Sequence, residues 1–363
     1  MGRYMDYGRP GKIRFSSKNK AVYFCGRNDD SSIKTGSDGN PIAHSAKKLG
    51  SGGTGKVYEV PTGPYPVPIV IKRYSNKILS ESGSAIDPYL RSLIEFRKSL
   101  PDNSRRIVDQ CTVWPQRLVF DDESGKVCGF AMHLIPPLFF SKMIVAGEEE
   151  TKESNLDFLL HGSEFRRSHG LPALTSKGRA RIIHDLMQIV LALHDHDYVL
   201  GDLSPKNMLV AVDMHNQGKN RVLLIDTDSF RKKGSIHPLK QLHTPDWIPP
   251  ECIKAGDELK SLTPNANPAK RARLEIDMFM QNQCTDVYKM CLAITRLYHD
   301  REYAALITSS EFADKALRRD IGEDFADYVL SGLSEKPGDR PDAGTMLTCL
   351  KNSLMSKRRK AES

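Results

Sequence analysis

The spacing of apolar residues predicts where helices lie along this chain. The clearest amphipathic pattern covers residues 175–194, where Ile, Leu and Val recur at intervals of three and four residues. Thr175 and Ser176 are both of the residue type that caps a helix N-terminus. Similar patterns predict further helices at residues 88–100, 289–298, 312–317 and 325–333.

Short runs rich in β-branched and aromatic residues predict strands between these helices. Residues 113–120 and 126–135 are two such runs, and the turn formers Asp-Asp-Glu-Ser-Gly between them predict a hairpin. Residues 57–60 and 69–74 predict a second hairpin across a turn rich in Pro and Gly. Further strands are predicted at residues 20–24, 208–212 and 222–225.

The composition is that of a globular protein, with 39% hydrophobic and 27% charged residues. A length of 363 residues suits one large domain or two ordinary ones. Since no apolar run reaches the ~18 residues of a membrane helix and the N-terminus lacks an apolar signal core, we expect neither a membrane partner nor secretion. The seven cysteines are scattered and form no C-x-x-C pair, so we expect reduced thiols in a cytoplasmic protein rather than a zinc site or disulfides.

The formal net charge of +8 favours acidic partners, including nucleotide phosphates. No zinc finger, RNP-type strand or long basic helix accompanies this charge, so we predict no nucleic-acid partner. Composition also marks some boundaries. We expect a partly ordered extension over residues 1–45, a polar insertion over residues 254–283 and a solvated basic tail over residues 351–363.

The stretch that follows the clearest helix carries the candidate chemistry. Asp202-Leu-Ser-Pro-Lys-Asn207 precedes one predicted strand, and Asp226 directly follows the next. An Asp and an Asn five residues apart, with a second Asp at a strand end, suit metal-assisted phosphoryl transfer. Asp and Asn are also common turn formers, so the remaining motifs decide between these interpretations.

A glycine-rich motif lies earlier, at residues 49–57, and fits the pattern L-G-x-G-x-x-G-x-V. Its glycines allow the backbone to approach phosphates, with which backbone amides can form hydrogen bonds. The same glycine spacing also occurs in dinucleotide-binding folds, but there a helix follows the glycines, whereas here a strand is predicted. Lys72 lies in the next strand within Val-Ile-Lys.

Together these motifs resemble the eukaryotic-type (Hanks-type) Ser/Thr protein kinases. Further matches lie in Thr-Pro-Asp-Trp at residues 244–247, Pro-Pro-Glu at 249–251 and Arg-Pro at 340–341. The run W-P…V-F…G-F-x-M from Trp114 to Met132 resembles a bacterial branch of this family, often encoded beside PP2C-type phosphatases and von Willebrand-type domain proteins.

The resemblance implies an α+β, bilobal fold. Residues 46–135 would be the N-lobe, with a small antiparallel sheet and one helix, and residues 136–350 the mainly helical C-lobe. Glu251, Asp286 and Arg340 would brace that C-lobe, with Arg340 paired to Glu251.

The resemblance also implies that ATP and Mg²⁺, or Mn²⁺ in its place, bind to this chain. Asp202 would accept the proton of a substrate hydroxyl, while Asn207 and Asp226 hold the metal ion. Lys72 would contact the nucleotide phosphates and pair with Glu95, with the nearby Glu81 as the alternative acid and a solvent-facing Glu95 as the other interpretation. The remaining nucleotide-binding positions would be Leu49, Gly50, Ser51, Gly52, Gly53, Gly55, Val57, the gatekeeper residue Met132 and the adenine-binding hinge residues His133, Leu134 and Ile135.

The chain departs from the family pattern at several positions. Leu200-Gly201 replaces His-Arg, which removes the usual anchor of a phosphorylated activation loop. Asp226-Thr-Asp228 replaces Asp-Phe-Gly, and Ser204 replaces a lysine near the γ-phosphate. The turn at residues 213–220 lengthens the path from Asn207 to Asp226.

The sequence therefore predicts an ATP-dependent Ser/Thr protein kinase that acts on protein hydroxyls, its own included, in bacterial signalling. Its partners would be a protein substrate and a PP2C-type phosphatase. One alternative is a pseudokinase, a nucleotide-binding regulatory scaffold, which the replaced motifs favour and the retained Lys72, Asp202, Asn207 and Asp226 oppose. The other is a kinase-fold enzyme for a small molecule, which the match to a peptide-docking segment at residues 244–251 opposes.

Overall fold

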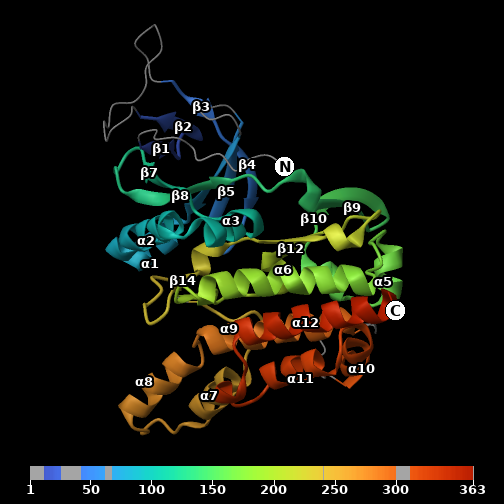
Figure 1. Ribbon diagram of the computed structural model, residues 1–363. Coiled ribbons are helices and arrows are strands. Elements are labelled where there is room, and N and C mark those ends of the chain that lie inside the picture. The colour runs from blue at the N-terminus through green and yellow to red at the C-terminus, as the bar shows by residue number, and fades with distance from the viewer. Residues whose placement is uncertain (1–11, 26–41, 62–67, 240, 300–310, 363) are drawn as a thin grey trace. The chain divides into compact units, whose positions relative to one another are not determined.

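The computed structural model describes residues 12–25, 42–61, 68–239, 241–299 and 311–362 (Figure 1). The chain divides into two compact units. The first comprises residues 1–135 and 236–240, and the second residues 136–235 and 241–363. The first is built on a sheet and the second is mainly helical, so the expected α+β class is confirmed.

An eight-stranded sheet forms the first unit, in the order β3-β2-β1-β7-β8-β6-β5-β4. Its strands are antiparallel to their neighbours except for β1 and β7, which run parallel. The N-terminal extension adds β1, β2 and β3 to this sheet, and the strand predicted at residues 20–24 corresponds to β2. The strands are β1 (Ile13–Ser16), β2 (Ala21–Phe24), β3 (His44–Ser45), β4 (Lys47–Ser51), β5 (Gly55–Val60), β6 (Ile69–Tyr74), β7 (Arg117–Asp121) and β8 (Val127–His133).

The extension belongs to the hydrophobic core of this unit. Ile13, Phe15 and Val22 are buried in the same cluster as Val60 and Ile71 of the central strands. Each fully buried side chain of this size stabilises the fold by roughly 1.5–3 kcal/mol. The β1–β2 hairpin is thus part of the folded unit, while residues 1–11 and 26–41 of the expected extension lie outside the described residues.

Helices pack beside the sheet, although the sequence predicted only one of them. The predicted helix is α2 (Ile86–Ser99), and α1 (Asn76–Ser82) and α3 (Asp102–Cys111) accompany it. The buried Trp114 indole donates a hydrogen bond of 2.9 Å to the Leu93 carbonyl of α2. Arg97 of α2 makes two hydrogen bonds, of 2.6 and 2.8 Å, to Asp109 of α3. Helix α3 was not predicted, because its sequence has few apolar residues.

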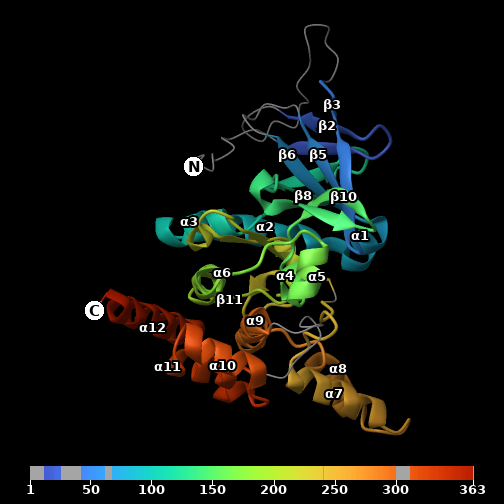
Figure 2. The ribbon, with the colours of Figure 1, turned by 90° about the vertical axis from the view of Figure 1, so that its right-hand side faces the viewer.

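The second unit contains helices and short strand pairs (Figures 1 and 2). The described residues of this unit form three antiparallel pairs, namely β9 (Phe140–Val145) with β10 (Glu148–Glu153), β11 (Tyr198–Val199) with β14 (Arg231–Lys232), and β12 (Met208–Ala211) with β13 (Arg221–Leu224). The helices are α4 (Leu156–Leu160), α5 (Ser163–Ser168), α6 (Ser176–His194), α7 (Pro250–Ser261), α8 (Pro268–Asp277), α9 (Gln283–Tyr298), α10 (Glu311–Asp320), α11 (Glu323–Gly332) and α12 (Ala343–Glu362).

Two helices, α6 and α9, form the centre of this unit. The Thr175 hydroxyl caps α6 by accepting a hydrogen bond of 3.1 Å from the Gly178 amide. Asn282 and Thr285 form a capping box at the start of α9, whose residues from Thr285 to Tyr298 are all buried. Because α9 packs on α6, α10 and α11, its polar side chains must find partners inside the protein.

Other parts of this unit have secondary structure that the sequence did not predict. Helices α7 and α8 occupy most of residues 254–283, which were expected as a polar insertion, and the basic tail forms the end of α12. The basic residues 358–360 remain exposed on that helix. The β9–β10 hairpin was not predicted either. Helices α7 and α8, strand β10 and the end of α12 are largely polar, so they lack the apolar periodicity on which the prediction depended.

The search for membrane helices covered the described residues. In that part of the chain, no helix combines the length and the apolar character needed to cross a membrane.

A buried ion pair between Arg340 and Glu251 braces the helical unit, as the sequence motifs predicted. The Arg340 guanidinium donates hydrogen bonds of 2.8 and 2.6 Å to the two carboxylate oxygens of Glu251. It also donates to the carbonyls of Ser334 and Cys284 and stacks 5.0 Å from the Tyr288 ring. The pair ties the start of α7 to the segment before α12.

We predict that Glu251→Ala destabilises the helical unit by about 3–5 kcal/mol, because it leaves the buried Arg340 charge uncompensated. Urea unfolding followed by circular dichroism measures this loss. The matched control is Glu258→Ala on the same helix, since Glu258 is exposed and pairs with the exposed Lys270. Equal unfolding midpoints for the two variants would contradict the role given to the buried pair.

Candidate functional site

The glycine-rich residues form the turn between β4 and β5. The Gly52 amide donates a hydrogen bond of 2.9 Å to the Gly55 carbonyl, which closes the turn. A side chain at Gly55 would meet the Arg73 carbonyl at 2.2 Å, so close strand packing requires this glycine. At Gly50, Gly52 and Gly53, by contrast, an added Cβ would meet nothing within 4 Å. These three glycines leave an exposed backbone that a phosphate can approach.

Lys72 lies in β6, directly opposite Val57 of β5 and Phe130 of β8. It is only 5% exposed, which is unusual for a lysine. The sheet thus brings Lys72 next to the strand that follows the glycine turn. Glu95, its predicted partner, lies on the exposed face of α2, so the Lys72–Glu95 ion pair stays a prediction.

The predicted gatekeeper and hinge residues lie at the end of β8 and just after it. Met132, His133, Leu134 and Ile135 are all partly buried. Burial is the main cause that lowers the pKa of His133 to about 4; the nearby Arg97 charge acts in the same direction and the Asp109 carboxylate in the opposite one. The His133 imidazole is therefore neutral at pH 7.

The predicted catalytic loop connects β11 to β12 in the helical unit. The Asn207 side-chain amide donates hydrogen bonds of 2.8 Å to Asp202 Oδ2 and 3.1 Å to the Asp202 carbonyl. The Ser204 amide donates to the same carbonyl at 3.0 Å. These bonds fix the loop around Asp202 and hold its carboxylate in one orientation. Ser204 itself is buried.

Asp226 lies beside this loop because β12 and β13 are antiparallel. Met208 pairs with Leu224, and the Ile225 amide donates a hydrogen bond of 2.9 Å to the Asn207 carbonyl. The residue after Ile225 is Asp226, which is exposed and has the left-handed backbone φ of 53°. The lengthened turn at residues 213–220 does not disturb the β12–β13 register. The Asp213 amide donates a hydrogen bond of 2.9 Å to the Asn220 side-chain oxygen, which closes the turn.

Two further residues belong to this site and were not given a site role from the sequence. The Thr244 hydroxyl donates a hydrogen bond of 3.2 Å to Asp202 Oδ1. Glu153, at the end of β10, has a raised pKa because of its burial and the negative charge of Asp226. No sequence signal marked Glu153, since it lies in a polar hairpin. Thr244 lay in a recognised motif, but its contact depends on the fold.

The available side chains suit a hard divalent cation. Because the amide nitrogen of Asn207 is committed to Asp202, its Oδ1 atom remains as a neutral oxygen ligand, and the Asp226 carboxylate supplies a charged one. Within the described part of the chain, no group of three or more His, Cys, Asp or Glu side chains is placed to hold a metal ion. Phosphate oxygens and water would therefore complete the coordination of Mg²⁺.

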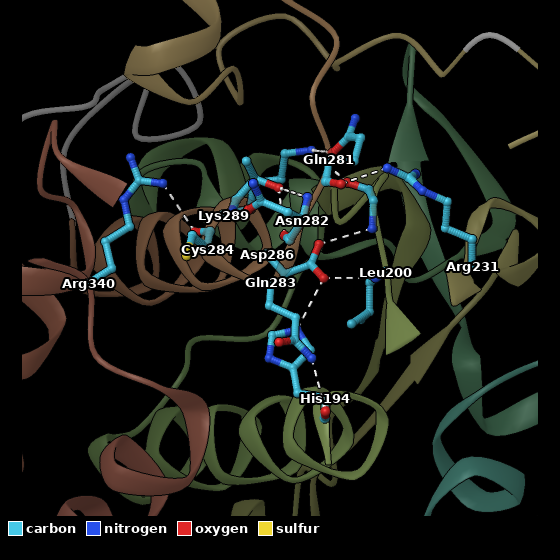
Figure 3. Close-up of polar contacts among 12 residues, drawn as sticks. His194, Leu200, Arg231, Gln281, Asn282, Gln283, Cys284, Asp286, Lys289 and Arg340 are labelled. Atoms are coloured by element: carbon cyan, nitrogen blue, oxygen red, sulfur yellow. Dashed lines mark hydrogen bonds and ion pairs between the residues drawn. The ribbon is translucent and has the colours of Figure 1, made fainter. Parts of the chain in front are cut away.

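A buried carboxylate of α9 holds the start of the loop through hydrogen bonds (Figure 3). Asp286 of α9 is fully buried and accepts hydrogen bonds from the amides of Leu200 at 2.8 Å and Gly201 at 2.9 Å. His194, at the end of α6, contacts the same carboxylate at 3.1 Å. Asp286 thus fixes the two residues directly before Asp202.

Comparisons with known proteins yield a structural likeness alone. No protein-family model matches the chain, and no curated protein matches its sequence. Two mutant forms of the PknI kinase domain from Mycobacterium tuberculosis align with a TM-score of 0.48 and 14% identity, over 86% of this chain and 94% or 95% of theirs. A third structure of that domain aligns with a TM-score of 0.48 and 15% identity, over 85% of this chain and 96% of its own. Identity this low assigns no activity to the chain.

The depressed pKa of His133 predicts acid sensitivity of the sheet unit. The unfolded chain takes up this proton near pH 6.5 and the folded chain only near pH 4, so stability falls as the pH drops through this window. Between pH 7 and pH 5 this titration should lower the free energy of unfolding of the parent protein by about 2 kcal/mol. We expect His133→Gln to lack this loss. Urea unfolding at both pH values measures this difference.

Unfolding at pH 8, where the imidazole is neutral in both states, serves as the internal control for altered packing. A variant with the same pH dependence as the parent protein would refute the assignment.

Proposed function

We propose that this protein is an ATP-dependent Ser/Thr protein kinase that uses Mg²⁺. The observation that carries the proposal is the loop in which Asn207 and Thr244 hold the Asp202 carboxylate, with Asp226 adjacent across the β12–β13 pair. This arrangement supplies one carboxylate for proton acceptance and two oxygen ligands for a cation. Phosphoryl transfer requires little more from a protein than this positioning and charge stabilisation.

In this proposal Asp202 orients the substrate hydroxyl and accepts its proton. The Thr244 bond supports this role, because it is of the kind that an incoming Ser or Thr hydroxyl would make to the same carboxylate. Asn207 keeps Asp202 oriented through its amide nitrogen. A bound Mg²⁺ ion would neutralise phosphate charge, with Asn207 and Asp226 as its protein ligands.

Nucleotide binding is proposed for the sheet unit. The open backbone at Gly50, Gly52 and Gly53 supports contact with phosphates, and Lys72 supplies a positive charge on the neighbouring strand. The partly buried residues Met132–Ile135 would accommodate the adenine ring. These roles agree with the buried position of Lys72, because a buried cation is costly unless it binds an anion or hydrogen-bond acceptors.

The replaced motifs favour the pseudokinase as the second candidate. Ser204 is buried and offers no charge to a phosphate, and Thr227 and Asp228 are buried in a short 3₁₀ turn after Asp226. A pseudokinase would bind Mg-ATP without transferring phosphate. The two candidates therefore differ in one measurable step.

We predict that the purified protein transfers ³²P from labelled ATP to a generic basic protein in the presence of Mg²⁺. Asp202→Ala and Asp226→Ala should each lower kcat by about 10³-fold or more, because each removes a group that acts on the transferred phosphoryl or its acceptor. The matched control is Asp195→Ala, since Asp195 is an exposed aspartate at the end of α6. It should retain the activity of the parent protein.

The outcomes separate the candidates. Transfer that survives Asp226→Ala would refute the metal-ligand role. Absence of transfer by the parent protein, combined with Mg-ATP binding that Lys72→Met abolishes, would establish the pseudokinase. Calorimetric titration with Mg-ATP measures that binding.

A further inference from the structure

The residue before Asp202 is held on both sides by helix α9. The Gly201 amide donates a hydrogen bond of 2.9 Å to Asp286 Oδ1, and the Gly201 carbonyl accepts one of 2.6 Å from the Lys289 ammonium. Asp286 and Lys289 lie one turn apart on α9, so both side chains reach the same peptide segment. Figure 3 shows both residues within this cluster of polar contacts.

Lys289 is buried in a way that packing alone does not explain. It is 1% exposed, and its ammonium also donates a hydrogen bond of 2.9 Å to Gln281 Oε1. Burial lowers the pKa of Lys289, while the carboxylates of Asp286 and Asp202 act in the opposite direction. A buried ammonium is costly to place, and an apolar side chain would fill the same volume at lower cost.

The side chain of Gln241, which is hydrogen-bonded to Arg231, lies beside Gly201. Gly201 has a φ of 72°, and a Cβ there would lie 3.3 Å from the Gln241 side-chain nitrogen. That nitrogen donates a hydrogen bond of 2.5 Å to the Ser229 carbonyl, and Arg231 donates to the Gln241 side-chain oxygen. Arg231 also donates to the Gln281 carbonyl at 2.6 Å, so Gln281 joins this group to Lys289.

We propose that Lys289 is a positioning residue for the catalytic loop, whose buried ammonium holds the Gly201 carbonyl and thereby fixes the direction of Asp202. Through Gln281 it also connects the loop to the segment after Asp226. The cluster needs no phosphate group, so the loop is ordered before any modification of that segment. The kinetic part of this inference rests on the proposed kinase activity.

The decisive variants are Lys289→Met, which keeps the length and removes the donor, and Lys289→Arg, which keeps a donor. We expect Lys289→Met to lower kcat by about 10- to 100-fold, because a catalytic group displaced by about 1 Å loses that much rate. The KM for ATP should change by less than about threefold, since no nucleotide contact is lost. Lys289→Arg should recover most of kcat.

The matched control is Ile294→Ala, which removes a buried side chain from the same helix. It should lower the thermal midpoint at least as much as Lys289→Met while kcat measured below that midpoint stays near the parent value. An equal loss of kcat in both variants would overturn the proposal, because it would show a general effect of α9 stability.

Hydrogen–deuterium exchange on the same variants gives a readout that does not depend on activity. Lys289→Met should speed exchange of the amides of residues 200–207 by about tenfold, with Lys289→Arg and Ile294→Ala close to the parent protein. Unchanged protection of this loop in Lys289→Met would overturn the proposal. If Lys289→Met speeds exchange of this loop while the parent protein transfers no phosphate, the positioning role is upheld and the kinase activity is refuted instead.

Discussion

The helical unit depends on one buried carboxylate. Asp286 holds the amides of Leu200 and Gly201 and contacts His194, so α6, α9 and the loop before Asp202 meet at a single side chain. A buried carboxylate is tolerated only when hydrogen-bond donors surround it, and this one has backbone and imidazole donors. These hydrogen bonds hold the loop in one conformation. A shift of α9 would leave the Leu200 and Gly201 amides without their acceptor.

The β12–β13 pair and Asn207 fix the rest of the loop that begins at the residues held by Asp286. The β12–β13 register places Ile225 against Asn207, and Asn207 in turn orients Asp202. The Ile225–Asn207 and Asn207–Asp202 hydrogen bonds share Asn207, so the position of Asp202 is fixed relative to the strand pair. Such support by neighbouring groups is what holds catalytic side chains in a productive geometry.

The sheet unit uses glycine for two distinct purposes. Gly55 and Gly129 allow β6 to approach its two neighbours, since a side chain at either would meet a backbone carbonyl of β6 at about 2 Å. Gly50, Gly52 and Gly53 leave the turn backbone open instead. Only the second group leaves backbone open to the approach of a ligand, although Gly55 belongs to the same glycine-rich motif. The N-terminal hairpin adds to the core of this sheet and so stabilises the strands that carry Lys72.

The sequence alone determined the elements with strong local signals, and only the tertiary structure decided how polar residues are used. The helix at Ser176–His194 with its Thr175 cap, the strands around the glycine motif and the Arg340–Glu251 pair followed from periodicity or from motifs. Helices α3, α7 and α8, the β9–β10 hairpin and the helical end of α12 gave no such signal, because they contain too few apolar residues at regular spacing. Lys289 carries no motif either. Its role depends on Gly201, 88 positions away along the chain, which only the folded protein brings within 2.6 Å of the ammonium.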